Sequence, residues 1–205
     1  MPVDPAAPPG VYRLDLGLYV ALLGQSRYLP LVADGKTLDT NDVTIAPIKV
    51  GGPPPGVTVA NPAPQHVQVA NLADQVTLLG YDLSLEPGTL RLTLYWRADA
   101  RLPADYTTFV HVRDVTGQAT GQAEAIVAQM DRPPADGAYP SSLWDPGEVI
   151  RDTILVPVPP HIPAGEYEII VGLYNLATGQ RLSVLNGQRQ PAGGYIRLQQ
   201  QVTVP

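Results

Sequence analysis

Five carboxylates fall close together in one segment of the chain: Asp131, Asp136, Asp145, Glu148 and Asp152. Calcium binds six to eight oxygen ligands in flexible geometry, so an acidic loop interrupted by proline and glycine could hold this ion. Asp131, Asp136 and Asp152 are thus calcium candidates, but their spacing matches no compact calcium-binding loop, and we expect no metal site. The alternative is that these acidic side chains simply remain solvated.

Tyr139 and Trp144 lie in the same segment, among several prolines. An exposed aromatic ring can stack on the apolar face of a sugar while neighbouring polar groups bind its hydroxyls. The sequence thus offers a candidate carbohydrate-binding face, formed by Tyr139, Trp144, Asp136 and Asp145. In the competing interpretation Trp144 closes the open end of a β-sandwich and Tyr139 covers it, because the WDPGE stretch runs directly into a strand. Exposure or burial of Trp144 distinguishes the two interpretations.

Catalytic patterns are sparse. His66, His111 and His161 are scattered, so a histidine metal site would depend on the tertiary fold. Ser141 and Ser142 lack the flanking glycines of a nucleophile elbow, and nothing selects which two carboxylates would form a glycosidase pair. The absence of cysteine excludes thiol nucleophiles and disulfides. We expect a protein that is not an enzyme, with no catalytic residues and no cofactor.

The composition indicates a folded, β-rich chain. Its 205 residues include 23 Pro and 19 Gly, yet 44% are hydrophobic and the net charge is −6. A chain this apolar can bury enough surface to offset its ordering entropy, so the prolines and glycines separate short elements. The acidic charge argues against nucleic acid as a partner. No apolar run approaches the roughly 20 residues of a membrane helix.

Period-two patterns between turn residues predict about seven or eight short antiparallel strands in the second part of the chain. Two alternating segments, residues 89–98 and 166–175, are the clearest. Their expected inward faces consist of Leu90, Leu92, Leu94 and Trp96, and of Tyr167, Ile169, Val171 and Leu173. The pattern is typical of an all-β protein, and we expect an antiparallel, immunoglobulin-like β-sandwich.

An internal repeat lies at an offset of 155 residues. Residues 8–25 read PPGVYRLDLGLYVALLGQ and residues 163–180 read PAGEYEIIVGLYNLATGQ. The identical pairs are Pro8/Pro163, Gly10/Gly165, Tyr12/Tyr167, Gly17/Gly172, Leu18/Leu173, Tyr19/Tyr174, Gly24/Gly179 and Gln25/Gln180. Each copy resembles a tyrosine corner, in which the hydroxyl bonds back to the preceding backbone. The alternative is that two unrelated strands share a Pro-x-Gly-x-Tyr turn.

The repeat suggests a division of the chain. Residues 1–50 are interpreted as the closing strands of a preceding, incomplete repeat, residues 51–64 as a Pro/Gly linker and residues 65–205 as a complete β-sandwich domain. The chain then reads as a slice of a longer tandem protein. Two strands alone are marginal in water, so we expect the Leu14/Leu16/Leu18 face to pack on the following domain or on another chain.

Five motifs in order carry a resemblance to known modules: LLGYDL (78–83), TLRLTLYWRA (89–98), YTTFVHVRD (106–114), YPSSLWDPGEVIRDT (139–153) and PAGEYEIIVGLYN (163–175). Together they resemble β-sandwich modules that follow membrane-embedded glycosyltransferases of the protein-mannosyltransferase type in some bacteria, and repeats of bacterial surface proteins. The resemblance implies an extracytoplasmic accessory module, at the cell surface or secreted as part of a longer protein. It assigns no catalytic residue.

Two functions follow as hypotheses. The first is a non-catalytic structural or interaction repeat, whose partners are neighbouring β-sandwich repeats or another copy of the chain. The second is a carbohydrate-binding module that assists a glycosyltransferase or binds envelope glycans. Neither hypothesis involves nucleic acid or direct membrane insertion of this segment.

Overall fold

The computed structural model describes residues 2–22, 25–118 and 120–204; Gly24, one of the matched repeat residues, lies outside them. The chain divides into an N-terminal unit, Met1–Pro53, and a C-terminal unit, Pro54–Pro205. Nearly all regular elements are strands, which confirms the predicted all-β class. Among the described residues, no helix combines the length and the apolar character that crossing a membrane requires.

The described residues of the N-terminal unit form three antiparallel strand pairs. They are β1 (Gly10–Gly17) with β6 (Asp42–Val50), β2 (Tyr19–Leu22) with β3 (Gln25–Tyr28), and β4 (Val32–Ala33) with β5 (Lys36–Thr37). The first pair is the longest. It joins the segment that carries the repeat motif to residues 42–50.

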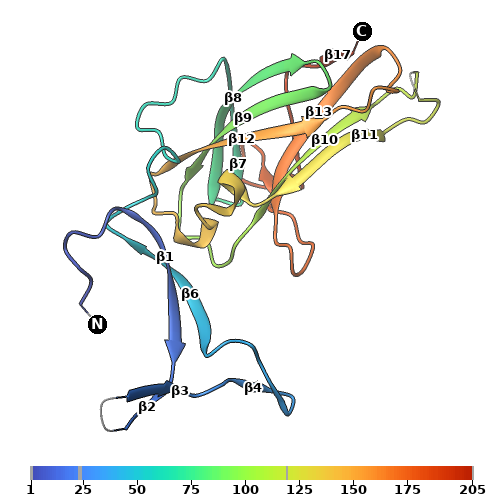
Figure 1. Ribbon diagram of the computed structural model, residues 1–205. Helices are drawn as coiled ribbons and strands as arrows, with labels where there is room; N and C mark the ends of the chain where they lie inside the picture. The colour runs from blue at the N-terminus through green and yellow to red at the C-terminus, as the bar shows by residue number, and fades with distance from the viewer. Residues whose placement is uncertain (1, 23–24, 119, 205) are drawn as a thin grey trace. The chain divides into compact units, whose positions relative to one another are not determined.

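The C-terminal unit contains two antiparallel sheets (Figure 1). The first has the order β12 (Val149–Pro157), β9 (Thr89–Ala98), β8 (Val76–Glu86), β7 (His66–Leu72), β14 (Val184–Leu185) and β15 (Pro191–Gly193). The second has the order β11 (Ala125–Arg132), β10 (Thr107–Asp114), β13 (Gly165–Tyr174) and β16 (Ile196–Arg197), and β17 (Val202–Val204) also pairs with β13. Two short 3-10 segments, η1 (Pro134–Gly137) and η2 (Ser141–Leu143), lie between β11 and β12.

The buried apolar side chains of the C-terminal unit come from both sheets. Every side chain predicted to face inward from residues 89–98 and 166–175 is fully buried, so the expected inward faces are confirmed. Burial does not alternate along these strands, because residues on the opposite face such as Tyr95 and Glu168 are buried as well. Burying one large aliphatic side chain stabilises a fold by about 1.5–3 kcal/mol. This shared core therefore holds the two sheets together.

The predicted linker is not a free spacer over its whole length. The Val59 N–H donates to the Val149 carbonyl over 2.9 Å, and the Val57 carbonyl accepts from the Arg151 N–H over 2.9 Å. β12 is the outer strand of its sheet, so its open edge can pair with a β-branched stretch such as residues 57–59. These residues therefore belong to the C-terminal unit.

Both copies of the repeat form the predicted corner hydrogen bond. The Tyr12 hydroxyl donates to the Pro8 carbonyl oxygen over 2.7 Å, and the Tyr167 hydroxyl donates to the Pro163 carbonyl oxygen over 2.7 Å. In each copy the strand that begins at this corner pairs antiparallel with a strand near the end of its segment, β6 or β17. The sequence repeat is therefore also a repeat of local structure.

Candidate functional site

The loop between β11 and β12 holds the residues predicted to bind carbohydrate or calcium. Trp144 and Tyr139 both have 0% exposure. The Trp144 indole Nε1 donates to the Tyr139 carbonyl over 3.0 Å. The ring faces are therefore unavailable for stacking on a sugar, and the predicted carbohydrate face at these two residues is wrong. Burial of both rings agrees with the competing interpretation, in which Trp144 and Tyr139 face into the domain.

Local hydrogen bonds explain why the loop turns its aromatic residues inward. The Tyr139 hydroxyl donates to the Glu148 carboxylate and to the Leu143 carbonyl, so the polar end of the ring is satisfied inside the fold. Burial, reinforced by the Glu148 carboxylate, raises the pKa of Tyr139. The same carboxylate accepts from the Asp145 N–H over 2.9 Å. One acidic residue thus fixes both ends of the turn before β12.

The two acidic members of the predicted carbohydrate face remain near the surface. Asp145 forms an ion pair with Arg101, and Asp136, whose side chain is 85% exposed, forms one with Arg132. The rings of Tyr139 and Trp144 point into the core. The two carboxylates therefore have no exposed aromatic ring beside them from this pair, and a sugar could not stack there as predicted.

The three calcium candidates do not converge. The Asp152 side chain is fully buried, Asp136 lies at the surface, and Asp131 lies 3.3 Å from the His111 Nε2 atom. Among the described residues, no group of three or more His, Asp or Glu side chains could hold a metal ion. The calcium candidates Asp131, Asp136 and Asp152 therefore do not form a cluster, because protein groups bind these carboxylates instead.

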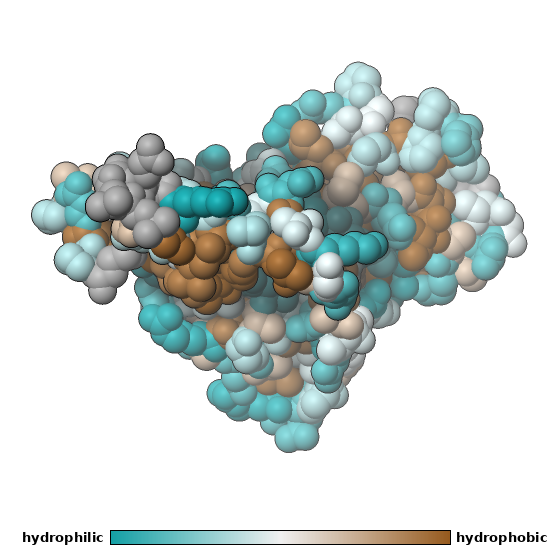
Figure 2. All heavy atoms as spheres, turned by 60° about the horizontal axis from the view of Figure 1, so that its bottom comes forward, coloured by the Kyte–Doolittle hydropathy of each residue, from teal (hydrophilic) through white to brown (hydrophobic). Residues whose placement is uncertain are grey.

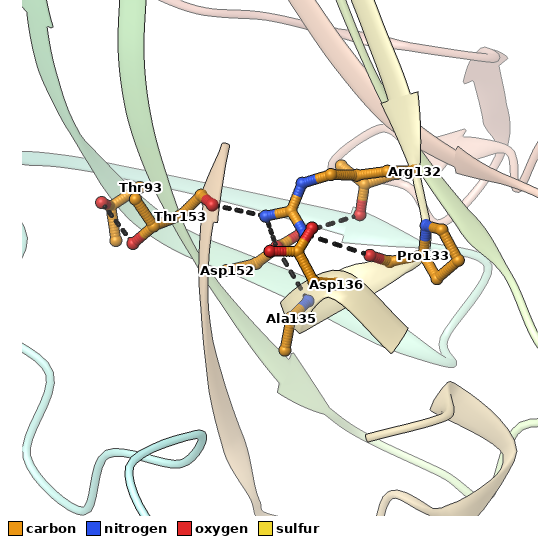
Figure 3. A network of polar contacts seen from close by, with 8 residues as sticks. Thr93, Arg132, Pro133, Ala135, Asp136, Asp152 and Thr153 are labelled. Carbon is orange, nitrogen blue, oxygen red and sulfur yellow. Dashed lines mark hydrogen bonds and ion pairs between the residues drawn. The ribbon is translucent and has the colours of Figure 1, made fainter. Parts of the chain in front are cut away.

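Asp152 anchors a buried polar network (Figure 3). Its carboxylate accepts from the Arg132 guanidinium at 3.0 Å, the Ala135 N–H at 2.9 Å and the Thr108 hydroxyl at 2.9 Å. Arg132 also donates to the Thr153 carbonyl. Burial raises the pKa of Asp152, and the Ala135 N–H and Arg132 oppose this shift. The network holds the loop where Ala135 and Asp136 adopt positive φ.

A second polar network lies on β10 and β13 and was missed by the sequence analysis. The buried Arg113 forms ion pairs with Glu168 and Glu124, and its guanidinium lies 5.0 Å from the Tyr195 ring centroid. Glu168 also pairs with Arg197. The sequence offered little indication of this network, because charged strand residues such as Arg113 and Glu168 are usually exposed to solvent.

A cavity of about 340 Å³ near Tyr106 was also not foreseen. Its lining is rich in amide and hydroxyl groups. The lining includes Gln75, Tyr106, Asn175, Thr178, Gln180 and Arg181. The lining comes from three separate connections between strands, residues 73–75, 103–106 and 175–183, so no single short motif could have indicated it.

The β1–β6 sheet exposes an apolar face. Its register places Tyr12, Leu14 and Leu16 of β1 on the same side as Ile48, Ala46 and Val43 of β6; we call these six residues the apolar face. Leu16 is 58% exposed, whereas its repeat counterpart Val171 has 0% exposure. Beyond β1, Leu18 is 68% exposed, whereas its counterpart Leu173 also has 0%. The same sequence motif therefore places its apolar side chains in the core of the C-terminal unit but on the surface of the N-terminal unit.

Comparison of the chain with protein-family models, with curated proteins and with solved structures finds no match.

Proposed function

We propose that the chain is a non-catalytic, extracytoplasmic accessory module of a larger surface or membrane-anchored protein, built from immunoglobulin-like β-sandwich repeats that contact one another. The observation that carries the proposal is the duplicated corner: Tyr12 and Tyr167 make the same hydrogen bond at equivalent places in two units. Duplicated units that can cover one another's apolar surfaces are typical of structural and interaction arrays.

The exposure of the N-terminal unit supports an interaction role. Among the described residues of this unit, the side chains that would form a core are largely exposed, and an extended apolar surface on a folded protein is typical of a binding site. Figure 2 shows apolar side chains gathered on the surface of this unit. Covering this surface with another β-sheet would complete the arrangement that the C-terminal unit displays.

Exchanging the two repeat segments tests the proposal. Residues 163–205 and 8–50 have the same length, so a chimera can carry residues 8–50 in place of residues 163–205. We expect this chimera to unfold cooperatively, because the transplanted β1 and β6 would meet the opening strands that they lack. A control chimera with Leu14, Leu16 and Leu18 changed to Ser should not fold. If the chimera without these serine substitutions also fails to fold, residues 8–50 are not structurally equivalent to residues 163–205.

The alternative function, carbohydrate binding, now depends on the cavity near Tyr106. Its amide groups at Gln75, Asn175 and Gln180 and the Arg181 guanidinium suit hydrogen bonding to sugar hydroxyls. A glycan array probed with the full chain tests this function. Binding that Gln75→Ala weakens would favour it, whereas absence of binding across a broad panel would remove it. Tryptophan fluorescence is a poor readout here, because Trp96 and Trp144 are both buried.

A further inference from the structure

One edge of β1 has no strand beside it within the N-terminal unit. Among the described residues, β1 pairs with β6 and with no other strand. Its repeat counterpart β13 has β16 and β17 along one edge and β10 along the other. Because β6 corresponds to the β16–β17 side, the free edge of β1 corresponds to the edge at which β13 binds β10. This strand type therefore accepts antiparallel partners on both edges.

The free edge of β1 is better suited to pairing than that of β6. Gly10–Gly17 contains no proline, so each of its residues keeps an N–H group. β6 is interrupted by Pro47, which has no N–H to donate, and the register shift opposite Leu14 and Asp15 leaves the extra residue, Ile45, on β6. Natural sheets protect their edges with prolines and bulges. β6 has both devices.

The charges on β1 are arranged symmetrically about Leu14. Arg13 and Asp15 flank this residue on the face opposite the apolar face, and Tyr12 and Leu16 follow on either side. In an antiparallel pair of two such strands centred on Leu14, each Arg13 lies opposite an Asp15, and each Tyr12 lies opposite a Leu16. Opposite charges directly across a strand pair stabilise it, and like charges destabilise it. The segment is therefore self-complementary.

We propose that β1 pairs antiparallel with β1 of a second copy of this chain, in the register centred on Leu14. The pairing joins two β1–β6 sheets into one four-stranded sheet and brings their apolar faces onto one continuous surface. It satisfies the open edge, and three or more strands with a hydrophobic face reach the size at which a sheet becomes stable. The inference rests on the proposed function, because it names the partner of an interaction module.

Sedimentation velocity of the full chain across a wide concentration range tests the pairing. We expect a reversible monomer–dimer equilibrium. Leu16→Lys should abolish the dimer, because it places a cation on the joined apolar surface. Val69→Lys is the matched control, since Val69 is an exposed apolar residue of a strand in the C-terminal unit. This control should leave the equilibrium unchanged.

Charge reversal tests the register. Asp15→Arg should weaken dimerisation about tenfold, because it sets two pairs of like charges opposite each other. Asp15 also accepts hydrogen bonds from Thr44 and from Arg13 of its own strand, so the single variant alone does not separate these effects. Mixing the Asp15→Arg chain with an Arg13→Asp chain restores opposite charges across the strands while like charges remain within each strand, and it should recover most of the affinity. Failure of this recovery would overturn the proposed register.

The remaining outcomes are decisive. A chain that stays monomeric at every concentration overturns self-pairing and leaves the free edge to a different polypeptide. A dimer that survives Leu16→Lys, or one that Val69→Lys removes equally, also overturns it. The swap of residues 163–205 for 8–50 does not depend on dimerisation. A cooperative chimera together with a monomeric chain would therefore refute the pairing and retain the proposed function.

Discussion

The Tyr167 hydroxyl donates a hydrogen bond to the carbonyl oxygen of Pro163, four residues earlier, over 2.7 Å. Tyr12 and Pro8 repeat this bond, also over 2.7 Å, in a unit where the following strand lies exposed. The bond depends on local sequence, since it forms in both surroundings. Burial of the strand that follows it depends on the sheets that surround it. Comparison of the two copies therefore shows that the corner hydrogen bond is determined locally, whereas burial of the following strand is determined by tertiary packing.

Tyr167→Phe should lower the free energy of unfolding of the C-terminal unit by about 1 kcal/mol, the typical contribution of one hydrogen bond. Urea unfolding followed by tryptophan fluorescence measures this unit alone, because both tryptophans lie in it. Tyr12→Phe is the matched control and should leave that transition unchanged. If both variants lower the free energy of unfolding of the C-terminal unit equally, the effect does not come from the Tyr167 hydrogen bond.

Gly172→Ala should destabilise the C-terminal unit by about 1–3 kcal/mol, the usual cost of overpacking. A Cβ atom at Gly172 would lie 2.6 Å from the Phe109 ring. Gly187→Ala is a suitable comparison, because a Cβ atom there meets no heavy atom within 4 Å. Chemical denaturation of both variants distinguishes steric conflict from a general effect of losing glycine. The prediction fails if the two midpoints shift alike.

Asp152→Ala should destabilise the fold by about 3–5 kcal/mol, because it leaves the Arg132 guanidinium without its buried partner. Asp136→Ala should change stability by no more than about 0.5 kcal/mol, since this carboxylate is largely exposed. Thermal melting compares the two variants. Calcium and a chelator should both leave the melting temperature of the unaltered chain unchanged, because protein donors already bind the Asp152 oxygens. A calcium-dependent rise would contradict this account.

Acid should destabilise the C-terminal unit through His111. Burial lowers the pKa of His111 from its usual 6.5, the nearby Asp131 carboxylate opposes this shift, and Arg181 and Arg113 add to it. The unfolded chain therefore takes up the proton first as the pH falls below 6.5. The stability that the neutral ring provides is present above that value and is lost as the pH falls through the folded pKa.

The comparison of the chain with His111→Gln at about pH 7.5 and about pH 5.5 measures this contribution. The unaltered chain should lose more stability on acidification than the variant does. An identical pH dependence would show that other groups account for the acid sensitivity.

The alternation in residues 89–98 predicted its buried face correctly because a strand repeats every two residues, so local sequence is sufficient there. The tyrosine corner was predictable for the same reason, since its two partners lie four residues apart. Trp144 was ambiguous because a rigid aromatic loop has the same sequence whether it faces a sugar or the core.

The structure of the acidic segment, residues 131–152, could not be predicted for a different reason. Asp152 lies 20 residues from Arg132 and 44 from Thr108, so its partners are set by the tertiary fold. Acidic residues that lie close together in the sequence therefore did not indicate a shared metal site. The pairing of residues 57–59 with β12 was also hidden, because it depends on which strand ends a sheet.

We propose that residues 8–50 fold as closing strands of a β-sandwich repeat do, with β1 able to pair with opening strands like those of the C-terminal unit. The most direct test of this claim is a longer chain in which residues 56–162 precede Pro8 of the present sequence, examined by amide hydrogen exchange. We expect amides of β1 between Val11 and Leu16 to become strongly protected relative to the original chain, with both chains kept at a concentration at which the original chain is monomeric. Exchange of these amides at an unchanged rate, with the added residues unfolded, would contradict the claim.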